Sequence, residues 1–193
     1  MPGVTDPMIP DRLYLTGDDE ADALLASDPM ALLIGFLLDQ QVSVQKAFSG
    51  PLELKRRIGT LDAGLIATMD AGVIDEAFRR RPALHRFPGS MATRTRELCA
   101  ALVERYGGDP RRIWEEAADA SDLRRRLLAL PGMGDMKADG LLAVLGKRFG
   151  IKPAGWDEVA PRHPTLGDVD SASALARYQE QKRAYKQGLR PES

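Results

Sequence analysis

The stretch that decides the fold is residues 121–150, which read SDLRRRLLALPGMGDMKADGLLAVLGKRFG. Leucines at helical spacing occupy residues 123–130. Pro131 should end that helix, because proline has no amide hydrogen and its ring clashes with the preceding turn. A second apolar period of about 3.6 residues runs over 135–149, and Gly150 follows it as the expected C-cap. The pattern therefore predicts two helices joined by a tight hairpin.

The hairpin itself consists of Gly132, Met133 and Gly134, and residues without a Cβ make such a turn most cheaply. Two glycines before a helix leave backbone N–H groups unblocked at the positive end of the helix dipole. Lys137 and the arginines at 124–126 add positive charge nearby. We therefore expect an anion site that suits a phosphate. An ordinary helical hairpin with a glycine turn has the same spacing, so the spacing alone does not separate the two interpretations.

The literal sequence of the hairpin resembles a known signature. Residues 130–134 read LPGMG and are followed by Lys137-Ala138, which is similar to the helix-hairpin-helix motif of the base-excision DNA glycosylases. That superfamily (HhH-GPD) includes endonuclease III and 3-methyladenine DNA glycosylase II, and the resemblance covers roughly residues 28–160. It implies an all-α, two-lobed fold with a cleft between the lobes. It also implies an enzyme that binds duplex DNA through the hairpin and removes a damaged base.

Two further stretches support the resemblance. Residues 38–44 read LDQQVSV and follow an apolar run that we expect to be a buried helix. They resemble the superfamily segment in which a glutamine follows a buried helix, in the form found in alkylbase glycosylases. Gln40 matches the position that helps fill the gap left by a flipped base, and Gln41 adjoins it as a DNA-binding candidate. The alternative is that both glutamines only end the helix. Residues 85–92 resemble the segment that leads into the hairpin lobe.

The resemblance also implies a reaction. The base is flipped into a pocket, and the transition state for its removal carries positive charge on the sugar. In bifunctional relatives a lysine attacks that sugar, but here Met136 occupies the lysine position and Lys137 lies one residue later. One residue on a helix is a rotation of about 100°, so we expect base removal without strand cleavage. Lys137 is then expected to contact phosphate, or else to be a solvated surface lysine.

A carboxylate near the sugar is needed to stabilise the cation or to orient a water molecule. In relatives it lies some twenty residues beyond the lysine position. Asp157 lies 21 positions after Met136 and fits this spacing, whereas Asp170 lies 34 positions after it and fits the local Val-Asp-Thr pattern. Asp170 would also serve as the N-cap of a helix over 171–186. Asp157 and Asp170 are both candidate catalytic residues, and a chain in which neither is competent would be a silent DNA-binding protein.

Composition limits the other possibilities. The chain has 193 residues, of which 44% are apolar, enough for one domain with a real core. Cys99 is alone, which excludes an internal disulfide and a cysteine-ligated iron–sulfur cluster. The two histidines are far apart in the sequence, so we expect no metal and no cofactor. Residues 79–152 contain 16 Lys and Arg against 9 Asp and Glu, whereas residues 1–78 contain 5 against 13. A basic middle region is typical of a DNA-facing surface.

The expected organisation is simple. Residues 1–10 form a flexible arm, residues 11–187 form a single two-lobed domain, and residues 188–193 form a disordered tail. No apolar run approaches the length of about 20 residues that a membrane span needs, and the N-terminal residues lack the pattern of an export signal, so we do not expect export. We expect a cytoplasmic, nucleoid-associated monomer whose partner is duplex DNA with damaged bases.

Local signals also set helix boundaries. Ser121 is the expected N-cap of the first hairpin helix, and Asp28 with Pro29 should begin the buried helix. Gly50-Pro51 is expected to break the chain before a short helix over 52–58. The function that these observations favour is a monofunctional DNA N-glycosylase, closest to the alkylbase enzymes. The alternatives are a catalytically silent DNA-binding or repair-accessory protein, and a helical protein–protein module.

Overall fold

The chain is all-α over the residues described by the computed structural model, 9–188, which contain no β-strand. Residues 1–8 of the expected arm and 189–193 of the expected tail lie outside this range. The elements are α1 (Asp19–Ser27), α2 (Pro29–Leu38), α3 (Val44–Ile58), α4 (Ala63–Thr68), α5 (Ala71–Arg79), α6 (Pro88–Tyr106), α7 (Arg112–Glu115), α8 (Ala120–Leu128), α9 (Asp135–Phe149), α10 (Trp156–Val159), η1 (Leu166–Asp168) and α11 (Ala172–Gly188). The predicted all-α class is therefore confirmed.

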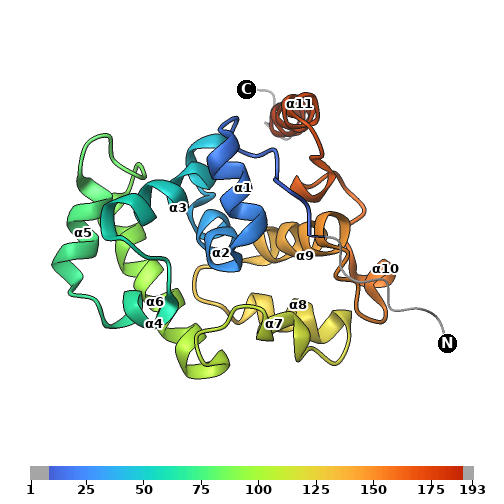
Figure 1. The fold of residues 1–193 in the computed structure, drawn as a ribbon. Helices are drawn as coiled ribbons and strands as arrows, with labels where there is room; N and C mark the ends of the chain where they lie inside the picture. The colour runs from blue at the N-terminus through green and yellow to red at the C-terminus, as the bar shows by residue number, and fades with distance from the viewer. Residues whose placement is uncertain (1–8, 189–193) are drawn as a thin grey trace.

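Helix α2 lies at the centre of the molecule. Its residues from Met30 to Leu38 are all buried, as the apolar run predicts. Helices α3 and α6 pack against it, and so does α9, so that α4–α6 gather toward one end of the molecule and α8–α10 toward the other (Figure 1). Each fully buried Leu, Ile or Phe contributes about 1.5–3 kcal/mol to stability. A helix that is apolar on every face can be stable only in such a position.

Most helices begin with a side-chain cap. The capping residues accept a backbone N–H of the first turn and are Asp18, Asp28, Ser43, Asp62, Asp70, Asp119, Thr165 and Ser171. The cap of α2 is therefore the predicted one. The prediction for α8 is wrong, because Asp119 caps this helix by accepting the N–H of Asp122 at 2.8 Å. Helix α8 already begins at Ala120, whose N–H donates to the carbonyl of Ala154 at 2.9 Å.

Helix α3 corrects another boundary. The prediction of a chain break at Gly50-Pro51 is wrong, because α3 continues from Val44 to Ile58 with Pro51 inside it. A proline in a helix interior costs about 3 kcal/mol. Packing offsets that cost, since Pro51 is buried and Phe48 meets Phe36 of α2 edge to face, with ring centroids 5.1 Å apart. Tertiary contacts therefore override the local preference here.

Most of the buried apolar residues of 9–188 form one contiguous core with members from α1 to α11. Cys99 lies in this core, and burial, with a smaller effect of Asp62, raises the pKa of its thiol to about 12. No single helix among the described residues is long and apolar enough to cross a membrane. Helices α1 and α2 meet that test only as a pair bent by 113°.

Candidate nucleic-acid interface

The turn between α8 and α9 begins with Gly132, whose φ of +78° lies in the left-handed region. The N–H of Met133 donates to the carbonyl of Leu130 at 3.2 Å and closes the turn. A Cβ on Gly132 would lie 2.3 Å from Cδ1 of Leu37, which belongs to α2. Glycine is therefore needed for two reasons: its backbone angle and the close approach of α2.

Gly134 has a different role from Gly132. Its φ of −86° and ψ of 179° are extended angles that any residue adopts. A Cβ placed on it would meet nothing within 4 Å, and the residue is exposed. The fold therefore does not require glycine here. The missing side chain leaves open space directly in front of the first turn of α9.

The first turn of α9 presents hydrogen-bond donors without acceptors. No side chain caps this helix, and its first backbone bond runs from the N–H of Ala138 to the carbonyl of Gly134 at 2.9 Å. Within residues 9–188, the N–H groups of residues 134–137 have no acceptor, and Gly134, Asp135 and Met136 are exposed. These donors add to the positive end of the helix dipole, which favours an anion at this position.

Met133 and Lys137 hold the hairpin from inside. The side chain of Met133 is buried in the core. The half-buried Lys137 donates from Nζ to the carbonyl of Leu37 at 2.9 Å and to that of Gly132 at 3.2 Å. Burial lowers the pKa of Lys137, and the negative charge of nearby Asp39 partly offsets this shift by raising it. Two of the three ammonium protons thus bind the end of α2 and the turn, which leaves one for a ligand.

The arginines next to the hairpin are engaged within the protein. Arg124 donates to Asp139 at 2.8 Å and to Asp135 at 2.9 Å, so it links α8 to the first turns of α9. Arginines 125 and 126 both bind the carboxylate of Asp122. The positive charge that the sequence places beside the hairpin is therefore largely compensated by neighbouring carboxylates. The backbone donors at the start of α9 have no such partners within residues 9–188 and remain available to an anion.

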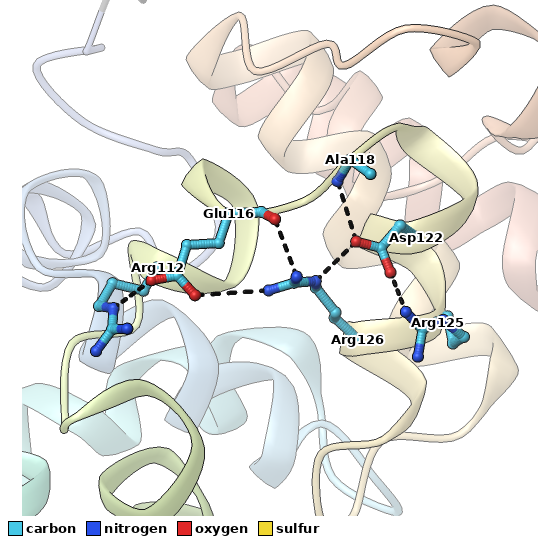
Figure 2. A network of polar contacts seen from close by, with 6 residues as sticks. All are labelled: Arg112, Glu116, Ala118, Asp122, Arg125 and Arg126. Atoms are coloured by element: carbon cyan, nitrogen blue, oxygen red, sulfur yellow. Dashed lines mark hydrogen bonds and ion pairs between the residues drawn. The ribbon is translucent and has the colours of Figure 1, made fainter.

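Figure 2 shows the network around Asp122. Its carboxylate accepts the N–H of Ala118 at 3.0 Å and Nε of Arg126 at 2.9 Å, and it also pairs with Arg125. These partners lower the pKa of Asp122 to about 2, with the Ala118 bond the largest cause. Arg126 also donates to the backbone carbonyl of Glu116 at 2.9 Å. The network orders the start of α8. Arg126 is largely used within it, whereas the side chain of Arg125 stays 77% exposed.

Gln40 lies at the end of α2 and is held in place by α6. Its amide nitrogen lies 3.1 Å from Sδ of Met91, and its amide oxygen accepts Nη1 of Arg94 at 3.3 Å. Nε2 of His85 lies 3.1 Å from the carbonyl of Leu38 and 3.0 Å from that of Gln40. Burial lowers the pKa of this histidine. His85 thus has partners that its isolated place in the sequence did not indicate.

Gln41 projects differently from Gln40. It has a φ of +55° and is the one residue other than glycine with a positive φ among residues 9–188. Its side chain is exposed. A left-handed backbone costs a residue with a Cβ about 1–2 kcal/mol, so surrounding structure must hold this turn. Of the two predicted glutamines, Gln41 is the one whose side chain reaches solvent beside the hairpin end of α2.

Asp157 lies away from the hairpin. It belongs to α10, where Trp156 packs so closely on Gly146 that a Cβ there would lie 2.3 Å from the indole. Gly146 is near the C-terminal end of α9, roughly 16 Å along the helix axis from Asp135 at 1.5 Å per residue. The structure therefore does not bring Asp157 to the open first turn of α9.

Asp170 does not lie beside the hairpin either. It is exposed in the segment between η1 and α11, beside a surface cavity of about 280 Å³ that Arg12 and Arg148 also line. It is not the cap of α11, because Oγ of Ser171 accepts the N–H of Ala174 at 3.1 Å. Neither of the two aspartates selected from the sequence therefore lies at the first turn of α9, because the residues near them, Gly146 and Arg148, belong to the C-terminal end of this helix.

The structure brings a third aspartate to the hairpin instead. Asp39 follows α2 directly, two residues after the carbonyl that binds Lys137. Burial raises the pKa of its carboxyl group, and nearby Lys182 and Lys137 partly oppose this shift. The sequence carried a signal for it, because Asp39 is the only charged residue between Asp28 and Lys46. Its position beside α9 and α11 required the tertiary fold.

Within residues 9–188, no group of three or more His, Cys, Asp or Glu side chains is arranged to hold a metal ion.

Comparison of the chain with protein-family models, with curated proteins and with solved structures finds no match. The geometry of the described residues therefore carries the functional interpretation.

Proposed function

We propose that the chain binds duplex DNA through the hairpin, residues 131–137, and removes a damaged base as a monofunctional DNA N-glycosylase of the helix-hairpin-helix superfamily. The observation that carries this proposal is the row of N–H groups at residues 134–137, which have no acceptor within residues 9–188 and of which the first three belong to exposed residues. In the proposed two-lobed arrangement, α2 lies between the lobes and the hairpin borders the cleft.

The hairpin offers what a DNA phosphate needs. A phosphate oxygen accepts backbone N–H groups at a helix N-terminus, and contacts of this kind fix a protein on DNA without reading its sequence. Gly134 supports this proposal, because no side chain stands between these donors and an approaching strand. Lys137 and Gly132 support it as well, since both hold the turn against the end of α2.

Gln41 is proposed to fill the space left by the flipped base. Its side chain is exposed on a turn with positive φ at the hairpin end of α2, whereas Gln40 is tied to α6. A side-chain amide both donates and accepts hydrogen bonds. It can therefore pair with the base that has lost its partner.

Strand cleavage is not part of the proposal. Met136 is 80% exposed at the position where bifunctional relatives have the lysine, and a thioether forms no Schiff base. The amine of Lys137 is directed toward two carbonyls. We therefore expect borohydride reduction during the reaction to trap no covalent protein–DNA complex. A trapped complex that disappears in Lys137→Gln would contradict a monofunctional mechanism.

Binding to DNA is tested by changing the open space at the hairpin. Gly134→Asp places a carboxylate where a phosphate is proposed, and Gly188→Asp makes the same change at a glycine that also has nothing within 4 Å. Affinity for an undamaged duplex is measured by fluorescence anisotropy at several salt concentrations. We expect Gly134→Asp to weaken binding at least about tenfold and Gly188→Asp to weaken it much less, with affinity falling as salt rises. Equal effects of the two variants would contradict the hairpin as the binding site.

A second candidate function is a DNA-binding protein without catalytic activity. The placement of Asp157 and Asp170 away from the hairpin favours it. Duplex DNA treated with dimethyl sulfate separates the two candidates, because it carries several methylated bases at once. A glycosylase releases free methylated bases that chromatography detects, whereas a silent binder releases none above the uncatalysed rate.

A further inference from the structure

Asp39 lies where α2 meets the hairpin. Its N–H donates to the carbonyl of Phe36 at 3.2 Å, which fixes its backbone at the end of the helix. The carbonyl of Leu37, two residues earlier, accepts Nζ of Lys137, and Leu37 also touches the hairpin at Gly132. The position of Asp39 relative to the turn is therefore set by direct contacts between α2 and α9.

The carboxylate of Asp39 has no structural task that the described residues reveal. It is half-buried, and within residues 9–188 it accepts no hydrogen bond and forms no ion pair. The aspartates at helix starts, by contrast, accept backbone N–H groups. A partly buried carboxylate without a hydrogen-bond partner costs stability. Its presence at the end of an otherwise apolar helix therefore favours a functional role.

Charged and polar groups from two helices, α9 and α11, lie near this carboxylate. Lys137 of α9 and Lys182 of α11 act on it electrostatically, and Tyr178 of α11 is close enough for Asp39 to raise its pKa, after burial. Arg94 of α6 in turn acts on Lys137. Helix α11 is held near the start of α3 by a reciprocal amide pair between Gln45 and Gln179, at 2.8 and 3.2 Å.

This arrangement places positive groups and a negative group at different positions, just as a nucleotide that loses its base has a negative phosphate and a cationic sugar at different positions. The cations and the open N–H groups of α9 suit phosphates, and the single carboxylate suits a sugar that becomes cationic. We infer that Asp39 is the catalytic carboxylate of the proposed glycosylase, in place of Asp157 or Asp170. The inference rests on the proposed function and names the group that performs its chemistry.

The proposed reaction has two steps. The bond between C1′ and the base nitrogen breaks, and its electron pair leaves with the base, so that the sugar becomes an oxocarbenium ion. Asp39 stabilises that cation electrostatically in a partly desolvated site. The oxygen of a water molecule then bonds to C1′, and its proton passes to the carboxylate of Asp39 and from there to solvent or to the departed base.

The raised pKa of Asp39 is consistent with this role. Burial is its largest cause, and Lys182 and Lys137 act in the opposite direction. A carboxylate with a raised pKa is a stronger base, which helps it to accept a proton near neutral pH. Base release should therefore fall in acid as Asp39 becomes protonated. The falling limb should lie above the pH at which an ordinary aspartate titrates.

The experiment compares four Asp→Asn variants of the full chain: Asp39→Asn, Asp157→Asn, Asp170→Asn and, as a matched surface control, Asp75→Asn. Asp75 is a surface residue paired with Arg79 in α5. Release of methylated bases from dimethyl sulfate-treated duplex DNA is measured with enzyme in excess, together with affinity for an undamaged duplex and circular dichroism. We expect Asp39→Asn to slow base release at least about 100-fold, with affinity changed less than threefold.

The possible outcomes distinguish a failure of the role of Asp39 from a failure of the proposed glycosylase function. Base release by Asp39→Asn within threefold of wild type would overturn the role of Asp39 and leave the proposed function intact. A loss confined to Asp157→Asn or Asp170→Asn would do the same. A wild-type protein that binds the duplex but releases no base would overturn the proposed glycosylase itself. If Asp39→Asn misfolds, Asp39→Ala provides the second test: added formate should restore part of its base release, and no restoration would contradict the inference.

Discussion

The two ends of α9 are built in opposite ways. At the C-terminal end, Gly150 adopts a left-handed cap, the N–H of Ile151 donates to the carbonyl of Leu145 at 2.9 Å, and Trp156 packs on Gly146. At the N-terminal end, the N–H groups of residues 134–137 have no acceptor within residues 9–188. The closed end contributes stability, whereas the open end has glycine at the N-cap position, which costs roughly 0.3 kcal/mol relative to a residue whose side chain caps the helix. The open end is the one at which we propose that a DNA phosphate binds.

The largest expected effect lies at the closed end. Trp156→Ala removes a buried side chain and leaves a cavity over Gly146, so the free energy of unfolding should fall by about 3–5 kcal/mol. Urea unfolding measures this loss. DNA affinity per folded molecule should remain unchanged, because the hairpin lies at the other end of α9. A variant that unfolds normally but loses DNA binding would show that the two ends do not have separate roles.

The next effect separates the two glycines of the hairpin. Gly132→Ala combines a left-handed φ with a contact against Leu37 and should lower the free energy of unfolding by about 2–4 kcal/mol. Gly134→Ala meets nothing within 4 Å and should cost about 1 kcal/mol or less. Thermal unfolding of both variants checks this order. Equal losses would contradict the placement of Gly132 against α2.

A smaller effect closes the open end deliberately. Gly134→Ser supplies a hydroxyl that can cap α9, and its extended backbone suits an N-cap. The free energy of unfolding should rise by about 0.3 kcal/mol, while DNA affinity should fall about two- to tenfold because the hydroxyl takes a donor from the phosphate. Stability and affinity should thus move in opposite directions. A gain in both would indicate that the N–H groups of α9 do not bind DNA.

The smallest effect concerns Asp39 and pH. Burial raises the pKa of its carboxyl group in the folded chain above the usual 3.8, so the charged form destabilises the fold at neutral pH. Asp39→Asn should therefore increase the free energy of unfolding at pH 7. The gain should disappear as pH falls through the folded pKa toward 3.8 and below, where wild-type Asp39 is neutral in both states. Urea unfolding at several pH values measures it, and a destabilised variant at pH 7 would contradict an unpartnered carboxylate.

Local chemistry explains which parts of the fold were predictable. The bounds of α9 and its glycine C-cap follow from apolar spacing and from glycine's freedom at positive φ, both of which are written in adjacent residues. The burial of α2 follows from its continuous apolar run. Pro51 and Ser121 failed as boundary signals because packing of α3 on α2 and an earlier cap at Asp119 outweighed them. Such competition is invisible to a local pattern.

The candidate site was predictable only in part. The hairpin and its open donors were expected from Gly132 and Gly134, and the structure agrees that no side chain caps α9. The pairing of the arginines at 124–126 with carboxylates depends on helices that meet in space. The carboxylate beside the hairpin was sought downstream in the sequence, at Asp157 or Asp170. The structure places Asp39 there instead, about 100 residues upstream of the hairpin.

The sequence by itself determined the all-α class, the buried central helix and the bend at residues 131–134, because each depends on side chains and backbone angles of neighbouring residues. Only the tertiary structure decided which polar groups face the bend. Lys137 turns toward the end of α2, the arginines of α8 are paired, and Asp39 stands without a partner among the described residues. These relations depend on how α2, α9 and α11 pack, and packing joins residues that no local pattern connects.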